Sequence, residues 1–99
     1  MNTLWIENAR AQFVRVYGQK RGLAVCNVVM PAVMGDFRKT VLNAEPGAAV
    51  TEQYRTDDRK TDVRLTGHKE LRNGREACVV EKIEIGDIPV CMGEEYLIL

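Results

Sequence analysis

One two-residue turn signal, Asn73-Gly74, constrains the fold of this chain more than any other feature. A type I′ turn needs a positive φ angle at both central residues, and Asn followed by Gly accepts these angles at the least cost. The flanking segments, Lys69 to Arg72 and Arg75 to Ile85, are therefore predicted to be the strands of a β-hairpin. The apolar residues of the second strand change phase between Val80 and Ile83, which indicates a β-bulge.

Further short strands are expected in the second half of the chain. Val50 to Arg55 is a strand candidate, and Asp62 to Gly67 alternates between apolar and polar residues as a half-buried strand does. Thr56 to Lys60 contains no apolar residue and is predicted to be a surface connection. Glu45-Pro46-Gly47 has proline and glycine where a turn favours them. Asp87 to Leu99 fits a last hairpin.

The tip of that last hairpin is expected at the acidic turn Gly93 to Glu95. Tyr96 to Leu99 then forms a core or edge strand, or a tail that pairs with a second subunit.

The first thirty residues allow two interpretations. Phe13 to Gly18 and Leu23 to Met30 are rich in β-branched and aromatic residues and fit a hairpin around the polar loop Gln19 to Gly22. Alternatively, apolar residues recur at helical spacing and predict a helix over about residues 4–16 that ends at Gly18. In that case Leu23 to Met30 is the first strand and ends at Pro31, which cannot donate to a ladder.

The resulting fold class is mostly β, either all-β or α+β. Eight glycines at short intervals favour many short strands, so we expect a small antiparallel barrel or sandwich of about five to seven short strands, with or without one N-terminal helix. The 99 residues form a single domain, 1–99, because chains divide into several cores only at about two to three times this length.

The charges balance over the whole chain but not along it. Fourteen basic and fourteen acidic residues give a formal net charge of zero, so no global field attracts nucleic acid or a membrane. Residues 1–39 carry six basic and two acidic groups, whereas residues 81–99 carry one basic and five acidic groups. We expect these opposite charges to cancel because the two ends of the chain lie side by side.

Cysteine usage and hydropathy favour a cytoplasmic protein. Cys26, Cys78 and Cys91 are an odd number in a chain with enough apolar residues to fold without disulfides. No secretory signal is recognisable at the start, and no apolar run approaches the ~18 residues that span a bilayer. We therefore expect no membrane association.

The sequence offers no catalytic signature. The only histidine, His68, could in principle pair with Cys78, but all three cysteines lie in apolar runs typical of buried residues, and His68 is expected at an exposed turn. The cysteines and His68 lack the paired spacing of a zinc site. Phosphate-binding loops and the hydrolase G-x-S-x-G motif are also missing. We expect a non-enzymatic protein without metal or cofactor.

The function expected from these exclusions is stoichiometric protein–protein association. An inhibitor, adaptor or assembly component would suit, for example a phage or mobile-element protein that blocks a host complex, and a homodimer is an option. The candidate contacts are charged or aromatic residues in predicted loops and at strand ends: Lys20, Arg21, Tyr54, Arg55, Asp57, Asp58, Arg59, Lys60, Glu94 and Glu95.

The alternative is single-stranded nucleic-acid binding. The hairpin from Val63 to Ile85 is similar to the last two strands of OB-fold single-stranded-DNA-binding proteins, where a glycine after one strand leads through an Asn-Gly turn to a strand rich in Val and Ile. The similarity covers about a quarter of the chain. The similar segment carries no binding motif. Separately from it, Tyr17 and Tyr54 each have basic neighbours and would supply the aromatic platforms beside a basic groove on which a small β-barrel stacks bases.

Overall fold

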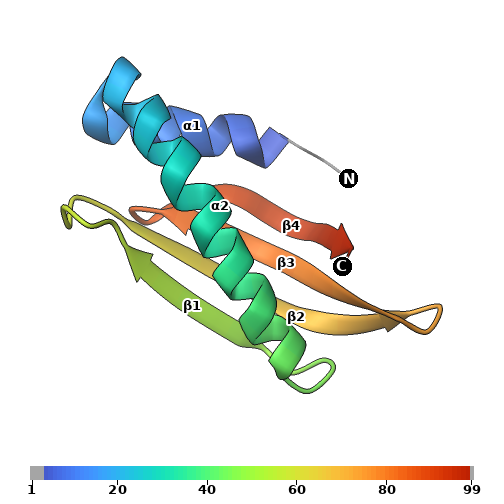
Figure 1. Ribbon diagram of the computed structural model, residues 1–99. Helices are drawn as coiled ribbons and strands as arrows, with labels where there is room; N and C mark the ends of the chain where they lie inside the picture. The colour runs from blue at the N-terminus through green and yellow to red at the C-terminus, as the bar shows by residue number, and fades with distance from the viewer. Residues whose placement is uncertain (1–3, 99) are drawn as a thin grey trace.

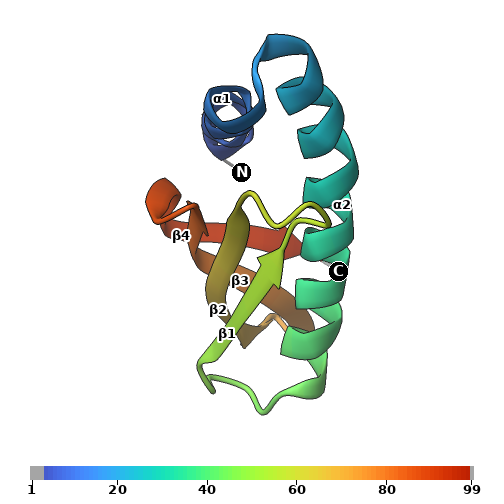
Figure 2. The ribbon, with the colours of Figure 1, turned by 90° about the vertical axis from the view of Figure 1, so that its left-hand side faces the viewer.

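The computed structural model describes residues 4–98, with side chains up to Gly93. Two helices precede a four-stranded antiparallel sheet whose strands follow chain order, β1-β2-β3-β4 (Figure 1). The helices lie on the same face of the sheet (Figure 2). The elements are α1 (Leu4–Tyr17), α2 (Gln19–Asn43), β1 (Val50–Arg55), β2 (Asp62–Arg72), β3 (Arg75–Ile85) and β4 (Ile88–Ile98).

The sequence predicts a mostly β fold, either all-β or α+β, and the structure shows an α+β fold; the expected barrel or sandwich is wrong. The described residues form one open sheet of four strands, neither a barrel nor a sandwich of five to seven. Two differences account for the missing strands. Residues 19–43 form the helix α2 instead of strands, and residues 88–98 form the single strand β4 instead of a hairpin.

The N-terminal helix is confirmed as α1, and the rival hairpin over residues 13–30 is wrong. Gly18 ends α1 with a φ angle of 88°, a value that glycine adopts at little cost. The next residues start α2 instead of a strand. Its buried residues recur every three or four positions: Gly22, Cys26, Met30, Val33, Phe37 and Val41. Burial of this stripe outweighs the strand preference of the β-branched residues between them.

Pro31 lies inside α2 and does not end a strand there. Its missing N–H leaves the carbonyl of Asn27 without its usual partner. Both residues are exposed, so water can reach that carbonyl. Beyond Pro31 the helix continues without interruption to Asn43.

The β2–β3 hairpin is confirmed. Arg72 pairs with Arg75, and the intervening Asn73 and Gly74 have φ angles of 51° and 76°, as a type I′ turn requires. The predicted bulge is also present. Glu81 is the extra residue, because Val80 pairs with Gly67 and Lys82 with Thr66.

β4 continues through the segment where an acidic turn was expected. Gly93 has a φ angle of 93° and lies at an irregular step of the β3–β4 pairing, so the strand bends without reversing. Glu94 and Glu95 belong to this strand by their backbone, and their side chains lie outside the described residues. Residues 96–98 form part of an edge strand, and Leu99 is outside the described range.

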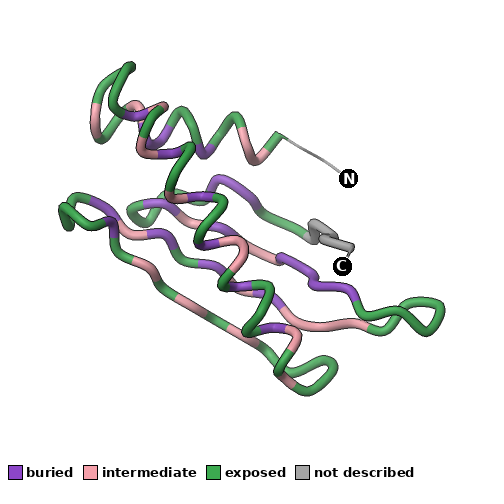
Figure 3. The backbone as a smooth tube through the Cα atoms, in the orientation of Figure 1, coloured by how far each residue is buried: buried purple, intermediate pink, exposed green. Residues whose placement is uncertain are grey.

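The core fills the space between the helices and one face of the sheet (Figure 3). Phe37 of α2 is fully buried over Gly67 of β2. A Cβ on Gly67 would lie 3.2 Å from the Phe37 ring and 2.1 Å from the carbonyl oxygen of Val79. Gly67 therefore lets α2 approach the sheet closely.

The two helices meet at Gly22. A Cβ there would lie 2.6 Å from the Cα of Val14 and 2.7 Å from the carbonyl oxygen of Phe13. These neighbours are backbone atoms of α1, which cannot move aside as a side chain can. Gly22 thus sets the angle at which α1 folds back along α2.

We predict that Gly22→Ala lowers the free energy of unfolding by about 1–3 kcal/mol, the range for overpacked sites. The matched control is Gly35→Ala in the same helix, where an added Cβ meets nothing within 4 Å. The control should raise stability by about 0.5–1 kcal/mol because alanine is the better helix former. Urea denaturation of both variants measures the difference, and equal stabilities would refute the close-contact role of Gly22.

Candidate functional site

The turn between the helices and the β1–β2 loop lie together at one end of the molecule. We call this region the corner surface; it comprises residues 17–21 and 56–60. Residues about forty positions apart meet here. The Tyr17 hydroxyl donates a hydrogen bond to Oδ1 of Asp58 at 2.8 Å and lies 3.1 Å from the Thr56 hydroxyl. The two segments are therefore tied by specific polar contacts.

Two cations lie against the Tyr17 ring. The Arg21 guanidinium carbon is 5.7 Å from the ring centroid and the Lys60 ammonium nitrogen is 5.6 Å from it. Both distances fall within the range of cation–π attraction. Arg21 also reaches Asp58, with Nη2 at 3.6 Å from Oδ2. Three predicted contact residues, Arg21, Asp58 and Lys60, thus converge on one tyrosine.

Asp58 is the polar centre of the corner surface. Its Oδ1 atom accepts hydrogen bonds from the hydroxyls of Tyr17 and Thr56 and from the backbone N–H of Lys60. The hydrogen bond from Tyr17, followed by those from Lys60 and Thr56 and the charge of Arg21, lowers the pKa of Asp58 to about 2. Burial and the nearby carboxylate raise the pKa of Tyr17. The loop is therefore held with Asp58 ionised and Tyr17 neutral.

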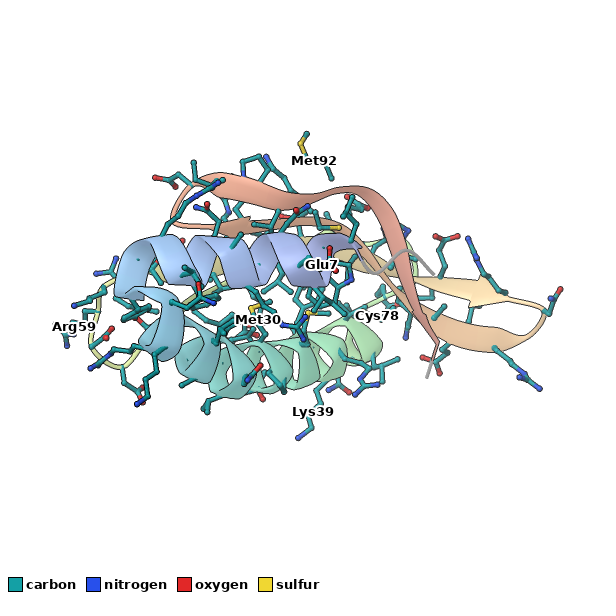
Figure 4. The ribbon with its side chains drawn as sticks, turned by 90° about the horizontal axis from the view of Figure 1, so that it is seen from above. Glu7, Met30, Lys39, Arg59, Cys78 and Met92 are labelled. Atoms are coloured by element: carbon teal, nitrogen blue, oxygen red, sulfur yellow. The ribbon has the colours of Figure 1, made fainter. Side chains whose placement is uncertain are left out.

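The loop itself is closed by buried threonines. The backbone N–H of Thr56 donates to the carbonyl of Thr61, and the Thr56 hydroxyl lies 3.1 Å from the same carbonyl. Arg59 takes a φ angle of 61° at the tip. The tip thus projects Arg59 away from the fold, as Figure 4 shows.

Beside the Tyr17–Asp58 contact lies an open hollow of about 310 Å³. Its floor is one face of the first half of α2, and its rim is the β1–β2 loop. It is lined by Tyr17, Arg21, Ala24, Val25, Val28, Val29, Thr56, Asp57 and Asp58.

Two residues that line the hollow are exposed to solvent in a way that the rest of the described chain does not compensate. Val28 is 72% exposed although it is an aliphatic side chain. The carboxylate of Asp57 is exposed and makes no hydrogen bond or ion pair with another described residue, unlike its neighbour Asp58. An apolar floor with an unpaired negative charge at its edge distinguishes this hollow from ordinary surface.

The other predicted contact residues have different surroundings. Arg55 binds Asp62 through two hydrogen bonds of 2.7 and 3.1 Å at the exposed end of β1. Tyr54 packs against the core and donates to Glu52 at 2.7 Å. Lys20 and Arg59 are exposed and have no side-chain partner among the described residues. The corner surface therefore contains six of the predicted residues, and Tyr54 and Arg55 lie outside it.

The sequence analysis missed Val28, because it placed this residue in a strand. Its position relative to the apolar stripe of a helix would have identified Val28 as exposed. The buried stripe of α2 includes Cys26 and Met30, and Val28 lies half a turn from both, on the opposite side of the helix. An aliphatic residue outside the buried stripe is the signal for the hollow.

His68 and Cys78, which the spacing alone would allow to pair, lie apart in the structure. Cys78 lies in the core between helices and sheet, whereas His68 pairs in register with Val79 and lies on the opposite face. All three cysteines are buried and free, as expected from their apolar surroundings. The expectation that His68 occupies an exposed turn is wrong; it lies within β2 and contacts two carboxylates.

No cluster of three or more His, Cys, Asp or Glu side chains among the residues that the structure describes has the arrangement of a metal site. None of the described helices combines the length and the apolar character needed to cross a bilayer.

A second apolar surface surrounds Trp5, near the start of α1. Leu4 and Met92 are 56% and 73% exposed and line a hollow with Trp5 and residues 89–91. Met92 points outward from β4 in Figure 4. Trp5 is partly buried against the core.

In comparisons with known proteins, no family model, no curated protein and no solved structure matches this chain. The corner surface is therefore interpreted from its own geometry.

We predict a specific pH dependence for Asp58. Its pKa in the folded protein, about 2, lies below the ordinary value of 3.8, so its contribution to stability is complete above about pH 4 and is lost as the pH falls through about 2. The stability advantage of the wild type over Asp58→Asn should shrink across this window in thermal denaturation. Asp57→Asn is the control and should follow the wild type, since Asp57 has no bonded partner; a constant advantage of the wild type over Asp58→Asn would contradict the role of Asp58.

Proposed function

We propose that this protein is a small binding protein that associates with a protein partner through the corner surface and the adjoining hollow on α2. The observation that carries the proposal is the hollow beside Tyr17, which is lined by an exposed valine, Val28, and an unpaired carboxylate, that of Asp57. The identity of the partner determines whether the protein acts as an inhibitor, an adaptor or an assembly component.

The floor of the hollow fits an apolar side chain. Val28 and Ala24 are exposed, and Val25 and Val29 are half-buried beside them. Covering a side chain of this size removes apolar surface from water and contributes about 25 cal/mol per Å². One aliphatic or aromatic anchor from the partner would fill the space.

The rim of the hollow determines the charge of the partner. Asp58 is already engaged by Tyr17, Thr56 and Arg21, which leaves Asp57 as the open carboxylate. A Lys or Arg placed next to the partner's anchor would meet Asp57 without displacing the internal contacts. The chemistry of the site therefore selects a segment in which an apolar residue neighbours a basic one.

The corner contacts also explain which residues should be dispensable for folding. Asp58 and Lys60 hold the loop to Tyr17, so replacing them alters stability as well as binding. Asp57 and Val28 are exposed and support no contact that the fold requires. These two residues are the sharper probes of binding.

The nucleic-acid alternative has less support in this geometry. Tyr17 has two cations against its ring, and Tyr54 is packed on the core with its hydroxyl bound to Glu52. Burial and the charges of Glu52 and Asp36 raise the pKa of Tyr54, which describes an acidic environment. A phosphate backbone would be repelled there. Single-stranded DNA binding is nevertheless a direct outcome of the test below.

The test is selection of short random peptides displayed on phage against the immobilised wild-type protein, with depletion against Val28→Asn. Enriched peptides should carry an apolar residue beside Lys or Arg. Binding of a synthetic enriched peptide should weaken at least about tenfold in Val28→Asn and in Asp57→Lys, as expected for a central contact worth more than about 1.4 kcal/mol. Fluorescence anisotropy measures the Kd, and the melting temperature should stay unchanged.

Two matched controls make the same chemical changes elsewhere. Leu71→Asn alters an aliphatic residue that is also exposed, at the β2–β3 turn, and Glu45→Lys reverses a charge in the α2–β1 connection. Both should bind the peptide as the wild type does. Equal binding of the peptide by all four variants would show that the corner surface and its hollow are not the binding site. Binding of a single-stranded oligonucleotide that weakens with salt and is lost in Tyr54→Ala would favour the alternative.

A further inference from the structure

The only histidine of the chain lies between two carboxylates on the sheet face that the helices leave uncovered. His68 Nε2 is 3.0 Å from Oε2 of Glu70, and His68 Nδ1 contacts Oε1 of Glu81. The imidazole side chain is only 16% exposed. The cluster joins neighbouring residues of β2 to the middle of β3.

This geometry determines the protonation state of His68. A neutral imidazole has one N–H donor and one acceptor nitrogen, whereas an imidazolium has two donors. Carboxylates that face both ring nitrogens therefore require the imidazolium. A neutral ring would turn one lone pair toward a carboxylate oxygen.

Two cations lie near the cluster. Arg72 Nε is 3.9 Å from Oε1 of Glu70, so Arg72 shares this carboxylate with His68, which faces its Oε2 atom. Lys82 is 3.7 Å from Glu84 instead. On β4, the neighbouring residues are Glu95 and Tyr96 by strand register, and their side chains lie outside the described residues. Partial burial opposes protonation, but the hydrogen bonds and charges of Glu81 and Glu70 outweigh it and raise the pKa of His68 above 6.5.

The position of Glu81 gives the cluster a structural consequence. Glu81 is the residue inserted between Val80 and Lys82, which pair in register with Gly67 and Thr66 of β2. The pairing of β3 with the edge strand β4 shifts at the same place, since Val80 pairs with Glu95 and Lys82 with Met92. The contact with His68 therefore anchors a bulge at which β3 shifts its register with both of its neighbours, although the β3–β4 pairing shifts once more between Ile83 and Glu84.

We propose that His68 is a proton-dependent latch: its imidazolium fastens the Glu81 bulge to β2, and its deprotonation releases the bulge and loosens the edge strand β4. The latch is closed while the imidazole is protonated and faces ionised carboxylates, and it opens as the pH rises through the titration of His68. It operates on the sheet, at a distance from the corner surface, and is independent of the proposed binding function.

The test begins with the titration of His68 by NMR, which is unambiguous because the chain has a single imidazole. The midpoint should lie above 6.5 in the wild type and should fall in Glu81→Gln, which keeps the shape of the side chain but removes its charge. A midpoint at or below 6.5 in the wild type would overturn the latch.

The second measurement is amide hydrogen exchange of the β3–β4 pairing over the same pH range, corrected for the exchange rate of an unstructured chain. Protection should drop by up to about tenfold for each pH unit by which the midpoint exceeds 6.5, because the latch favours the closed state by that ratio. His68→Gln should show no such pH dependence. A raised midpoint with constant wild-type protection would reduce the cluster to a static ion pair and refute the release of β4.

Neighbouring amides provide the internal control. The β1–β2 pairing is regular from Val50–Gly67 to Arg55–Asp62 and does not involve Glu81, so its protection should not follow His68. Should His68→Gln fail to fold, the wild-type comparison of the two pairings, together with the NMR titration, still decides the proposal. Parallel loss of protection in both pairings would indicate global unfolding and would also refute the latch.

Discussion

The close approach of the two helices at Gly22 is the contact on which the arrangement of this protein depends. With no side chain at this position, the backbone of α1 passes directly over α2, and the positive φ angle of Gly18 supplies the sharp turn between them. α1 is thereby directed across the end of the sheet toward β4, where Asn8 donates to the carbonyl of Val90. The basic N-terminal part of the chain and the acidic C-terminal part become neighbours through this docking of helix on strand.

The same turn between helices creates the corner surface. Because α1 ends where it does, Tyr17 faces the β1–β2 loop and its hydroxyl meets Asp58. Three of the six charged binding candidates in the corner surface, Arg21, Asp58 and Lys60, are engaged here by contacts within the chain. Within the hollow, the exposed side chain of Val28 and the carboxylate of Asp57 differ from them because they make no such contact. Exposure alone would not distinguish Asp57 from Asp58, the other acidic residue of the loop.

The two faces of the sheet are stabilised by different interactions, apolar packing on one and ion pairs on the other. The face under the helices is packed with aliphatic side chains and with Phe37, which needs the missing side chain of Gly67 to fit. On the opposite face, pairs such as Arg55–Asp62 and the His68 cluster connect neighbouring strands. Their contribution depends on ionisation, so pH acts on this face and hardly on the core. The Glu81 bulge affects both faces. The extra residue changes which side chains of β3 point into the core, and its carboxylate contacts His68 on the opposite face.

The sequence by itself determined the features that depend on neighbouring residues. Asn73-Gly74 and Pro46-Gly47 form their turns, residues 62–67 alternate about the sheet, and the phase change near Glu81 marks the bulge, because φ preferences and side-chain alternation act over a few residues. Only the tertiary structure decided that α2 is a helix, since burial of its stripe against the sheet outweighs local strand preference. It also decided that β4 continues through Gly93 and that Tyr17 meets Asp58, forty-one residues away. Contacts at such separations leave no local pattern, because they arise only when the packed elements bring the residues together.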